Sequence, residues 1–216
     1  EVAALARKDI ATVGIIGSGT MGVGISLAFL GGGFKVRILD GQADALDRGV
    51  KRIRDTIAKN LASGRVTEAK AEAQNAALSP TLDFADLADC DIIVEAAFET
   101  MAVKQDVFGK LDAVAKADAI LASNTSYLDI DQIAAATRRP SQVVGMHFFS
   151  PANIMKLVEV VKGKDTAPAV IATVVELARK IGKVPVVSGN AYGFIGNRML
   201  AVRRKEADQL VLLGAT

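Results

Sequence analysis

The chain has 216 residues, of which 50% are hydrophobic and 23% are charged, so it is long enough to bury one large core. Its net charge of +2 is too small to indicate a nucleic-acid partner, and no apolar run is long enough to span a bilayer, so we expect neither. The single cysteine, Cys90, excludes an internal disulfide bond and is expected to be a small buried side chain in a protein of a reducing compartment.

Short apolar runs alternate with segments of helical period along the chain. Strands are predicted, in order, over residues 12–16, 35–39, 78–82, 91–95, 119–122, 142–148, 157–161 and 184–187. Helices are predicted over residues 20–30, 44–62, 67–77, 101–116, 129–136, 168–181 and 195–213, after a helical or linker lead-in at residues 1–8. This alternation favours a doubly wound α/β fold, in which helices cover both faces of a mostly parallel sheet. Pro185 predicts that the last strand lies at a sheet edge, because proline cannot donate a ladder hydrogen bond.

The turn after the first strand carries the pattern G-x-G-x-x-G, which binds a dinucleotide when a strand precedes it and a helix follows. Gly17 permits the sharp turn, Gly19 lets a pyrophosphate approach the backbone, and Gly22 lets the helix pack closely on the sheet. The helix that begins with Thr20 and Met21 then directs its free N–H groups and its dipole at the phosphates. We expect all five residues to bind the cofactor.

The second strand ends at Asp40, an acidic residue about 20 positions beyond the glycines, as a Rossmann-type dinucleotide-binding fold requires. Its carboxylate can accept hydrogen bonds from an adenosine ribose and would repel a 2′-phosphate. We therefore expect NAD rather than NADP as the cofactor. The alternative is an ordinary strand–turn–helix in which Asp40 only caps a helix.

The helix predicted over residues 44–62 has a basic face opposite its apolar one. This face carries Arg48, Lys51, Arg52, Arg54 and Lys59. Such a face is most often simply solvated. The alternative is a surface that steers the anionic tail of a substrate.

The last predicted helix has few apolar partners in the rest of the chain. Its apolar residues are Ile195, Met199, Val202, Leu210 and Leu213. A loop rich in Gly and Asn at residues 188–193 precedes it. We therefore expect a dinucleotide-binding domain over residues 1–190 and the first helix of a largely missing all-helical domain over residues 191–216. Because the chain starts at Glu1 and stops just after this helix, we expect a segment of a longer protein.

Ligands of such sheets bind beyond the carboxyl ends of the strands, so polar residues there are the candidates for chemistry. They are Asp40, Glu95, Glu99, Asn124, Ser126 and His147. His147 is the only histidine, and a histidine beside two phenylalanines is more often a core residue. Glu159 in the next strand favours catalysis, because a carboxylate among apolar residues is costly unless it is paired. If the two strands adjoin, Glu159 accepts from one ring nitrogen and leaves the other free to take a proton.

The chain resembles the NAD-binding domain of the L-3-hydroxyacyl-CoA dehydrogenase family. The resemblance rests on residues 17–22, 94–99, 123–126, 147–151, 157–160 and 192–198, which follow one another in the order and spacing of the family. It implies oxidation of L-3-hydroxyacyl-CoA to 3-ketoacyl-CoA in fatty acid β-oxidation, with hydride transfer to NAD+ and no metal.

The resemblance also implies roles for single residues. His147 would take the proton from the 3-hydroxyl group, and Glu159 would orient it. Ser126 and Asn197 would hydrogen-bond the reacting oxygen and the histidine. The residues implied to line the nicotinamide and its ribose are Glu99, Lys104, Asn124 and Ser150. Without the family, Ser126 and Asn124 could merely cap the next helix, and Lys104 could be a surface charge.

The sequence departs from the single-function members at Ser150, where they commonly have Asn. Together with residues 189–194, Ser150 is more similar to the multifunctional enzymes, which carry an enoyl-CoA hydratase domain upstream. We therefore expect a homo-oligomer, or part of a multifunctional enzyme, that acts on acyl-CoA. It would lie in the cytoplasm of a bacterium, or otherwise in the matrix of a peroxisome or mitochondrion. Since the helical domain would close the acyl-CoA site, the chain alone should bind NAD but turn over poorly.

Two other functions remain open at this point. The chain could belong to an NAD-dependent dehydrogenase of a hydroxy acid without CoA, since the L-gulonate-type enzymes share the dyad. It could also be a non-catalytic dinucleotide-binding scaffold. The intact set of His147, Glu159, Ser126 and Asn197 disfavours the scaffold, which needs none of them.

Overall fold

The computed structural model describes residues 7–214. The strands are β1 (Thr12–Ile16), β2 (Lys35–Leu39), β3 (Leu78–Thr81), β4 (Ile92–Glu95), β5 (Ile120–Ser123), β6 (Val143–Phe148), β7 (Leu157–Lys162) and β8 (Val184–Gly189). The α-helices are α1 (Thr20–Gly31), α2 (Ala43–Ala62), α3 (Glu68–Ala76), α4 (Met101–Val114), α5 (Ile130–Ala134), α6 (Pro168–Lys180) and α7 (Gly196–Leu212). The 3-10 helices are η2 (Phe84–Leu87) and η3 (Pro140–Gln142).

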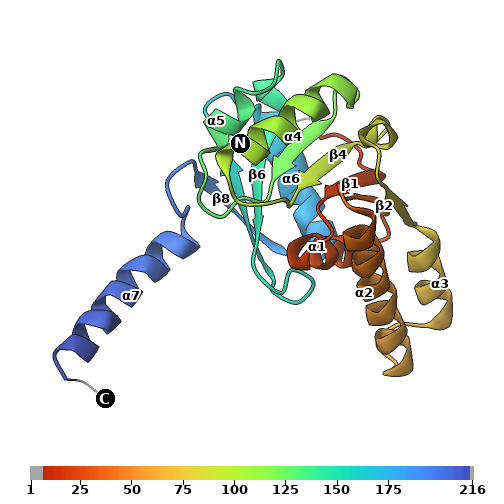
Figure 1. Cartoon of the computed structure of the whole chain (residues 1–216), viewed down its shortest axis with the longest axis horizontal. Coiled ribbons are helices and arrows are strands. Elements are labelled where there is room, and N and C mark those ends of the chain that lie inside the picture. The colour runs from red at the N-terminus through yellow and green to blue at the C-terminus, as the bar shows by residue number, and fades with distance from the viewer. Residues whose placement is uncertain (1–6, 215–216) are drawn as a thin grey trace.

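All eight strands form one sheet in the order β3-β2-β1-β4-β5-β6-β7-β8 (Figure 1). The strands β1 to β6 run parallel, as the doubly wound prediction requires. The order reverses between β1 and β4, and in such folds the ligand crevice opens at this point. β8 lies at the edge, which confirms the prediction from Pro185.

The chain direction reverses at β7, which pairs antiparallel with β6. Residues 149–156 between the two strands are too few for the crossover that a parallel pair needs. β8 then pairs parallel to β7. This reversal sets His147 on β6 directly opposite Glu159 on β7.

The parallel strands are apolar throughout because helices cover both of their faces. In β4, Ile92 and Val94 join a cluster that includes side chains of α1, α2 and α6. The residue between them, Ile93, joins a second cluster with side chains of α4 and α5. Successive side chains of a strand point to opposite faces, so one short run supplies both layers of the core.

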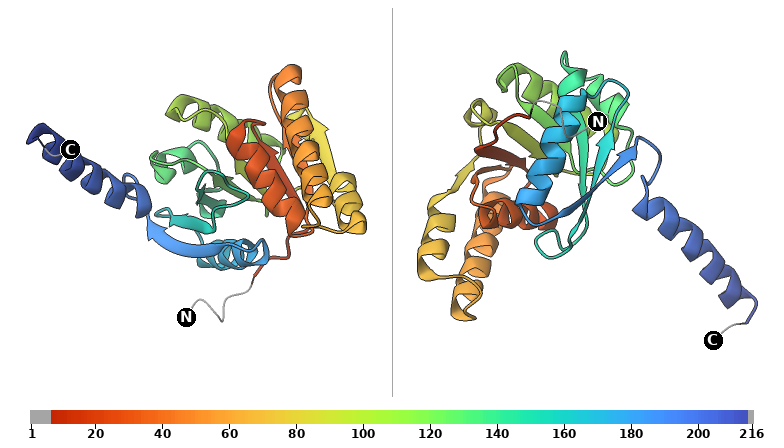
Figure 2. Two further views of the ribbon diagram at one scale, coloured as in Figure 1. Left: turned by 90° about the horizontal axis from the view of Figure 1, so that it is seen from below. Right: turned by 180° about the vertical axis from the view of Figure 1, so that it is seen from behind.

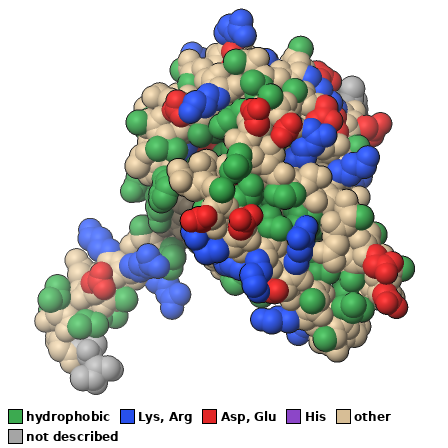
Figure 3. Space-filling view, turned by 45° about the vertical axis from the view of Figure 1, so that its right-hand side comes forward, with side chains coloured by type: hydrophobic (Ala, Val, Ile, Leu, Met, Phe, Trp, Pro, Cys, Tyr) green, Lys and Arg blue, Asp and Glu red, His purple; other side chains and the backbone are tan. Residues whose placement is uncertain are grey.

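α7 stands clear of the sheet in both views of Figure 2. None of its residues is buried, and Met199, Val202 and Leu210 are each more than half exposed. Figure 3 shows hydrophobic and basic side chains side by side on this helix. Beyond its first turns, the helix thus has no packing partner within residues 7–214, and its assignment to a second domain stays a prediction.

The expected and observed elements differ mainly at their ends. The helix expected over residues 129–136 is limited to Ile130–Ala134, and η2 and η3 were not expected. Of the lead-in expected at residues 1–8, only Arg7 and Lys8 are described, and neither is helical; residues 1–6 lie outside the described part. Among the described helices, none combines the length and the apolar character that a bilayer span requires.

Candidate functional site

The glycine-rich turn lies between β1 and α1, at the carboxyl edge of the sheet. Gly17 has φ +95°, and a Cβ there would lie 2.7 Å from the Ala96 carbonyl oxygen. A Cβ on Gly22 would lie 1.8 Å from the Gly17 carbonyl oxygen. At Gly19, by contrast, no atom lies within 4 Å of the position of a Cβ. Side chains are therefore excluded at two positions by the protein itself, and the third faces open space.

The first turn of α1 offers unsatisfied hydrogen-bond donors. Gly19 caps the helix without a side-chain hydrogen bond, and the turn contains no acidic residue. Within residues 7–214, no acceptor is found for the N–H groups of Thr20, Met21 and Gly22. Free N–H groups at the positive end of a helix bind anions, and phosphates in particular.

Asp40 lies directly beyond β2 and next to this turn. Its Oδ2 accepts hydrogen bonds from the backbone N–H (2.8 Å) and the hydroxyl (2.6 Å) of Ser18. Its Oδ1 accepts only a longer bond, 3.2 Å, from the Gln42 N–H, and so retains room for a further donor. Partial burial raises the pKa of Asp40, but the bonds donated by Ser18 and Gln42 outweigh it, so the pKa lies below its usual value. The carboxylate is therefore ionised and able to accept from a ribose hydroxyl.

Beyond β4, a buried lysine joins two carboxylates. Lys104 is 1% exposed, and its Nζ lies 2.7 Å from Glu95 Oε1 and 3.2 Å from Glu99 Oε2. It also donates to the Ala97 carbonyl. The alternative that Lys104 is a surface charge is wrong. Glu95, a strand-end candidate to which no specific role was assigned, is fully buried and also accepts from Ser123 Oγ at 2.8 Å.

Glu99 joins this cluster to the loop after β5. Its Oε1 accepts from Thr125 Oγ1 and from the Ser126 N–H, both at 2.6 Å. Burial raises the pKa of Glu99, but these bonds and Lys104 lower it further, so the pKa lies below its usual value. The residue that caps α5 is Asp129, so the alternative that Asn124 or Ser126 caps this helix is wrong.

Asn124 and Ser150 both lie near the end of β6, where Asn124 bonds Phe148 and Ser150 follows two residues later. Asn124 accepts a hydrogen bond at Oδ1 from the Phe148 N–H (2.9 Å), and its Nδ2 has no partner among the described residues. The amide NH2 group is thus available to a ligand. Ser150 is exposed in the loop that follows Phe149.

His147 and Glu159 form a buried pair. His147 Nδ1 and Glu159 Oε2 are 2.7 Å apart, which confirms the predicted contact. Both residues are at most 4% exposed, and the imidazole packs against Phe149 and Phe194 with ring centroids 4.5 and 5.7 Å away. An ionised carboxylate can only accept, so Nδ1 carries the proton and Nε2 is an acceptor. Nε2 has no partner within residues 7–214.

Asn197 does not contact His147. Its Nδ2 donates instead to the Ser126 carbonyl oxygen at 3.4 Å, which brings the loop after β5 and the first turn of α7 together. Glu159 was expected to orient His147, and its Oε1 in addition accepts from the N–H groups of Ile195 and Gly196. These backbone donors carry no sequence signal that could have revealed them.

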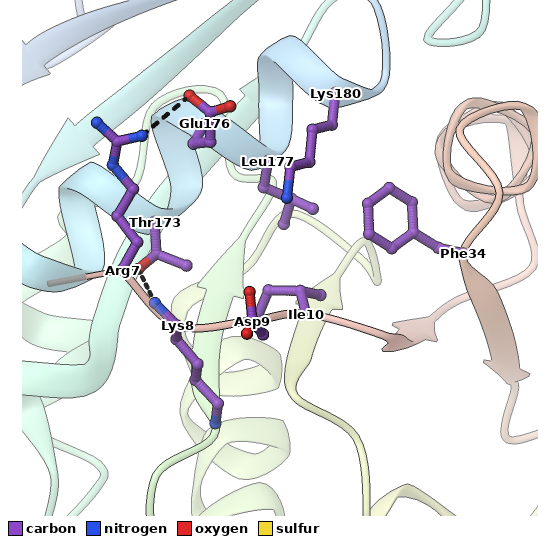
Figure 4. A pocket seen from close by; sticks show the side chains of 9 residues that line it. All are labelled: Arg7, Lys8, Asp9, Ile10, Phe34, Thr173, Glu176, Leu177 and Lys180. Atoms are coloured by element: carbon purple, nitrogen blue, oxygen red, sulfur yellow. Dashed lines mark hydrogen bonds and ion pairs between the residues drawn. The ribbon is translucent and has the colours of Figure 1, made fainter.

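The pocket drawn in Figure 4 is not part of this site. Its volume is about 170 Å³, and it lies beside Ile10 and Phe34, which precede β1 and β2 at the amino edge of the sheet. The ion pair of Arg7 with Glu176 (3.5 Å) and the bond from the Lys8 N–H to Thr173 join the start of the described chain to α6 there. The candidate site lies at the opposite, carboxyl edge.

The family model for the 3-hydroxyacyl-CoA dehydrogenase NAD-binding domain matches residues 12–191, from β1 to just beyond β8. This chain belongs to the 3-hydroxyacyl-CoA dehydrogenase family. The predicted cofactor, NAD, is therefore confirmed. The free N–H groups of α1, the open space at Gly19 and the ionised Asp40 fit its pyrophosphate and its adenosine ribose.

Members of the family are similar along nearly the whole chain. The peroxisomal bifunctional enzyme of Cavia porcellus is 44% identical over 197 residues, which are 90% of this chain and 27% of that enzyme. The probable 3-hydroxybutyryl-CoA dehydrogenase of Deinococcus radiodurans is 40% identical over 93% of this chain and 72% of its own. The solved structure of (S)-3-hydroxybutyryl-CoA dehydrogenase from Ralstonia eutropha has a TM-score of 0.92 and 34% identity over 95% of this chain and 73% of that one.

The chain thus spans about a quarter of the length of the bifunctional relatives. It spans nearly three quarters of the Deinococcus relative.

Proposed function

We propose that this chain is the NAD-binding part of an L-3-hydroxyacyl-CoA dehydrogenase, an enzyme that forms 3-ketoacyl-CoA in fatty acid β-oxidation. The observation that carries the proposal is the buried pair of His147 and Glu159, 2.7 Å apart. It lies at the end of β6, on the same sheet edge as the glycine-rich turn. A nucleotide-binding scaffold would have no use for such a pair.

His147 acts as the base at Nε2. Glu159 holds the proton on Nδ1, which leaves the Nε2 lone pair free to take the proton of the 3-hydroxyl group. The charge of Glu159 then stabilises the imidazolium, and in the reverse direction His147 returns the proton to the ketone oxygen. NAD+, held by the glycine-rich turn and Asp40, would supply the acceptor for the hydride that leaves C3 of the substrate. A positioned base contributes roughly 10²- to 10⁴-fold to such a reaction.

Ser126 and Asn197 hold the reacting oxygen in this proposal. The bond between the Asn197 amide and the Ser126 carbonyl supports it, because that bond brings the two side chains to one place. The Ser126 hydroxyl has no partner among the described residues and can donate to the substrate oxygen. The direct bond from Asn197 to His147 that the family implies would require the amide to turn.

The nicotinamide and its ribose are bound by Glu99, Asn124 and Ser150. Lys104 supports this set through its ion pair with Glu99. Asn124 supplies its free NH2 group, and the Glu99 side chain, which is 40% exposed, can accept from a ribose hydroxyl at Oε2 beside Lys104. Lys104 is too buried to touch a ligand, and its donors already serve two carboxylates and a carbonyl. We assign it the task of fixing Glu99 and residues 97–99.

The basic face of α2 steers the substrate in this proposal. Its residues, Arg48, Lys51, Arg52, Arg54 and Lys59, are all exposed. Among the residues that the structure describes, Lys51 alone of these five has an ion-pair partner, Asp55. The CoA moiety carries several phosphate charges, and a group of unpaired cations raises the local concentration of such an anion.

The remaining parts of the proposal concern the whole protein. Residues 191–216 begin an all-helical domain that binds the acyl chain and forms a homo-oligomer, or the chain is part of a multifunctional enzyme. The unpacked α7 and the names of relatives such as the fatty acid oxidation complex subunit alpha of Pseudomonas entomophila support this. The location is the cytoplasm for a bacterial protein, or otherwise a peroxisomal or mitochondrial matrix.

Turnover by the full-length gene product tests the proposal. NADH formation should be fast with L-3-hydroxybutyryl-CoA and slow with the D isomer, free 3-hydroxybutyrate and L-gulonate. The His147→Gln variant should keep its affinity for NAD in calorimetry and lose roughly 10²- to 10⁴-fold in kcat. A preference for a free hydroxy acid would contradict the substrate, and full turnover by the variant would contradict the base.

A further inference from the structure

Both oxygens of the Glu159 carboxylate are engaged, and they face different elements. Oε2 holds Nδ1 of His147 at 2.7 Å. Oε1 accepts from the Ile195 N–H at 2.9 Å and from the Gly196 N–H at 2.8 Å, where α7 begins. The carboxylate, which is 1% exposed, thus joins the imidazole of β6 to the first turn of a helix.

The loop that leads into α7 is held firmly at the same place. Asn190 Nδ2 donates to Asp129 at 2.5 Å and to Asp131 at 3.0 Å, which ties the loop to α5. Phe194 is 3% exposed, has φ +48°, and packs against the ring of His147. From residue 201 onward, every described residue of α7 is exposed. The helix is therefore attached to the sheet mainly through groups that touch the dyad.

We propose that the backbone N–H groups of Ile195 and Gly196 are positioning groups of the catalytic dyad. They fix the plane of the Glu159 carboxylate toward His147, and they draw part of its negative charge away from the imidazole. A carboxylate that shares its charge with two donors at the positive end of a helix stabilises an imidazolium less well. The position of α7 and the affinity of His147 for a proton are therefore coupled.

The elements around the dyad bring few other charges near it. β6 has no titratable side chain besides His147, and β8 has none at all. Arg198 lies in the first turn of α7, and Glu99 lies behind Ser126 at the end of β5. Neither is in hydrogen-bond or ion-pair contact with the dyad, so the two N–H groups are its only donors from the backbone among residues 7–214.

The role of this coupling in catalysis rests on the proposed function. The coupling itself can be tested without any substrate. Because His147 is the only histidine, its Cε1–H resonance reports the titration of the dyad without mutation. Gly196→Pro removes one donor, whereas Gly196→Ala adds a Cβ beside the Phe149 ring, 3.0 Å away, and keeps the donor. The titration midpoint should rise by roughly half a pH unit in the proline variant relative to the alanine variant. Equal midpoints in the two variants would overturn the proposal.

A proline at 196 also disfavours the helical conformation of Ile195, whose ψ is −57°, so a second measurement uses the unaltered chain. The amide proton resonances of Ile195 and Gly196 should shift with pH at the midpoint of His147. This shift should vanish in His147→Gln, while the amide of Gly33, far from the dyad, stays constant in both. If the amide proton shifts of Ile195 and Gly196 do not change as His147 titrates, the coupling is overturned, whatever substrate the enzyme oxidises.

Discussion

Lys104→Met should destabilise the fold far more than its place on a helix suggests. Lys104 lies on the helix α4, and lysines on helices usually face solvent, but only 1% of Lys104 is exposed. Methionine fits the aliphatic stem and removes the ammonium group. Glu95, which is fully buried, would lose its counter-ion and keep only the bonds from Ser123 and from the Ala97 N–H.

The size of the effect follows from this burial. Removing one partner of a buried ion pair costs about 3–5 kcal/mol, because the other charge stays uncompensated. The free energy of unfolding of a folded domain is about 5–15 kcal/mol, so the variant should lose a large fraction of its stability. At about 2–4 °C per kcal/mol, its Tm should fall by roughly 6–20 °C.

Lys110→Met on the same helix is the matched control. Lys110 pairs with Asp106 at 2.7 Å, but both side chains are more than half exposed. Such an i,i+4 pair contributes about 0.3–0.5 kcal/mol. Urea unfolding followed by circular dichroism gives both values, since the chain has no tryptophan. If Lys104→Met costs no more than Lys110→Met, the buried cluster does not stabilise the fold in the way described.

The remaining predictions concern a thiol, two glycines and an acid. Burial raises the pKa of Cys90 to about 12, so a thiol reagent at neutral pH should label this residue only after unfolding, and labelling of the native protein would contradict its burial. Gly22→Ala should lower the Tm, because its Cβ would lie 1.8 Å from the Gly17 carbonyl oxygen, whereas Gly19→Ala should fold normally and lose NAD affinity in calorimetry. The pKa of Asp40 is below its usual 3.8, so its stabilisation is present above that pH and is lost as the pH falls through the lowered value. Urea unfolding from pH 7 to pH 3 should therefore show a steeper acid loss for the natural chain than for Asp40→Asn.

The sequence was sufficient where a local pattern determines the geometry. The strand–glycine–helix pattern and the acidic end of the second strand predicted the nucleotide-binding turn, and the structure has each element there. The pairing of His147 with Glu159 was predicted because an isolated carboxylate is unfavourable among apolar neighbours. The first inference rests on the small size and conformational freedom of glycine, and the second on the free-energy cost of burying an unpaired charge.

The sequence was insufficient where the partner is backbone or where burial is unusual for the residue. Lysine is almost never fully buried, so nothing in the pattern of α4 distinguished Lys104 from Lys110. The hydrogen bonds from the N–H groups of Ile195 and Gly196 to Glu159 depend on the positions of two backbone nitrogens in the folded chain. The reversal of β7 was readable only from the short connection that precedes it, and alternation alone favoured a parallel strand.

A crystal structure of this chain with NAD+ would test the central claim most directly. The account predicts the adenosine ribose on Asp40, the pyrophosphate over Gly19, and the nicotinamide ring beside Nε2 of His147. A nicotinamide bound away from that nitrogen, with the imidazole facing only Phe149 and Phe194, would contradict it.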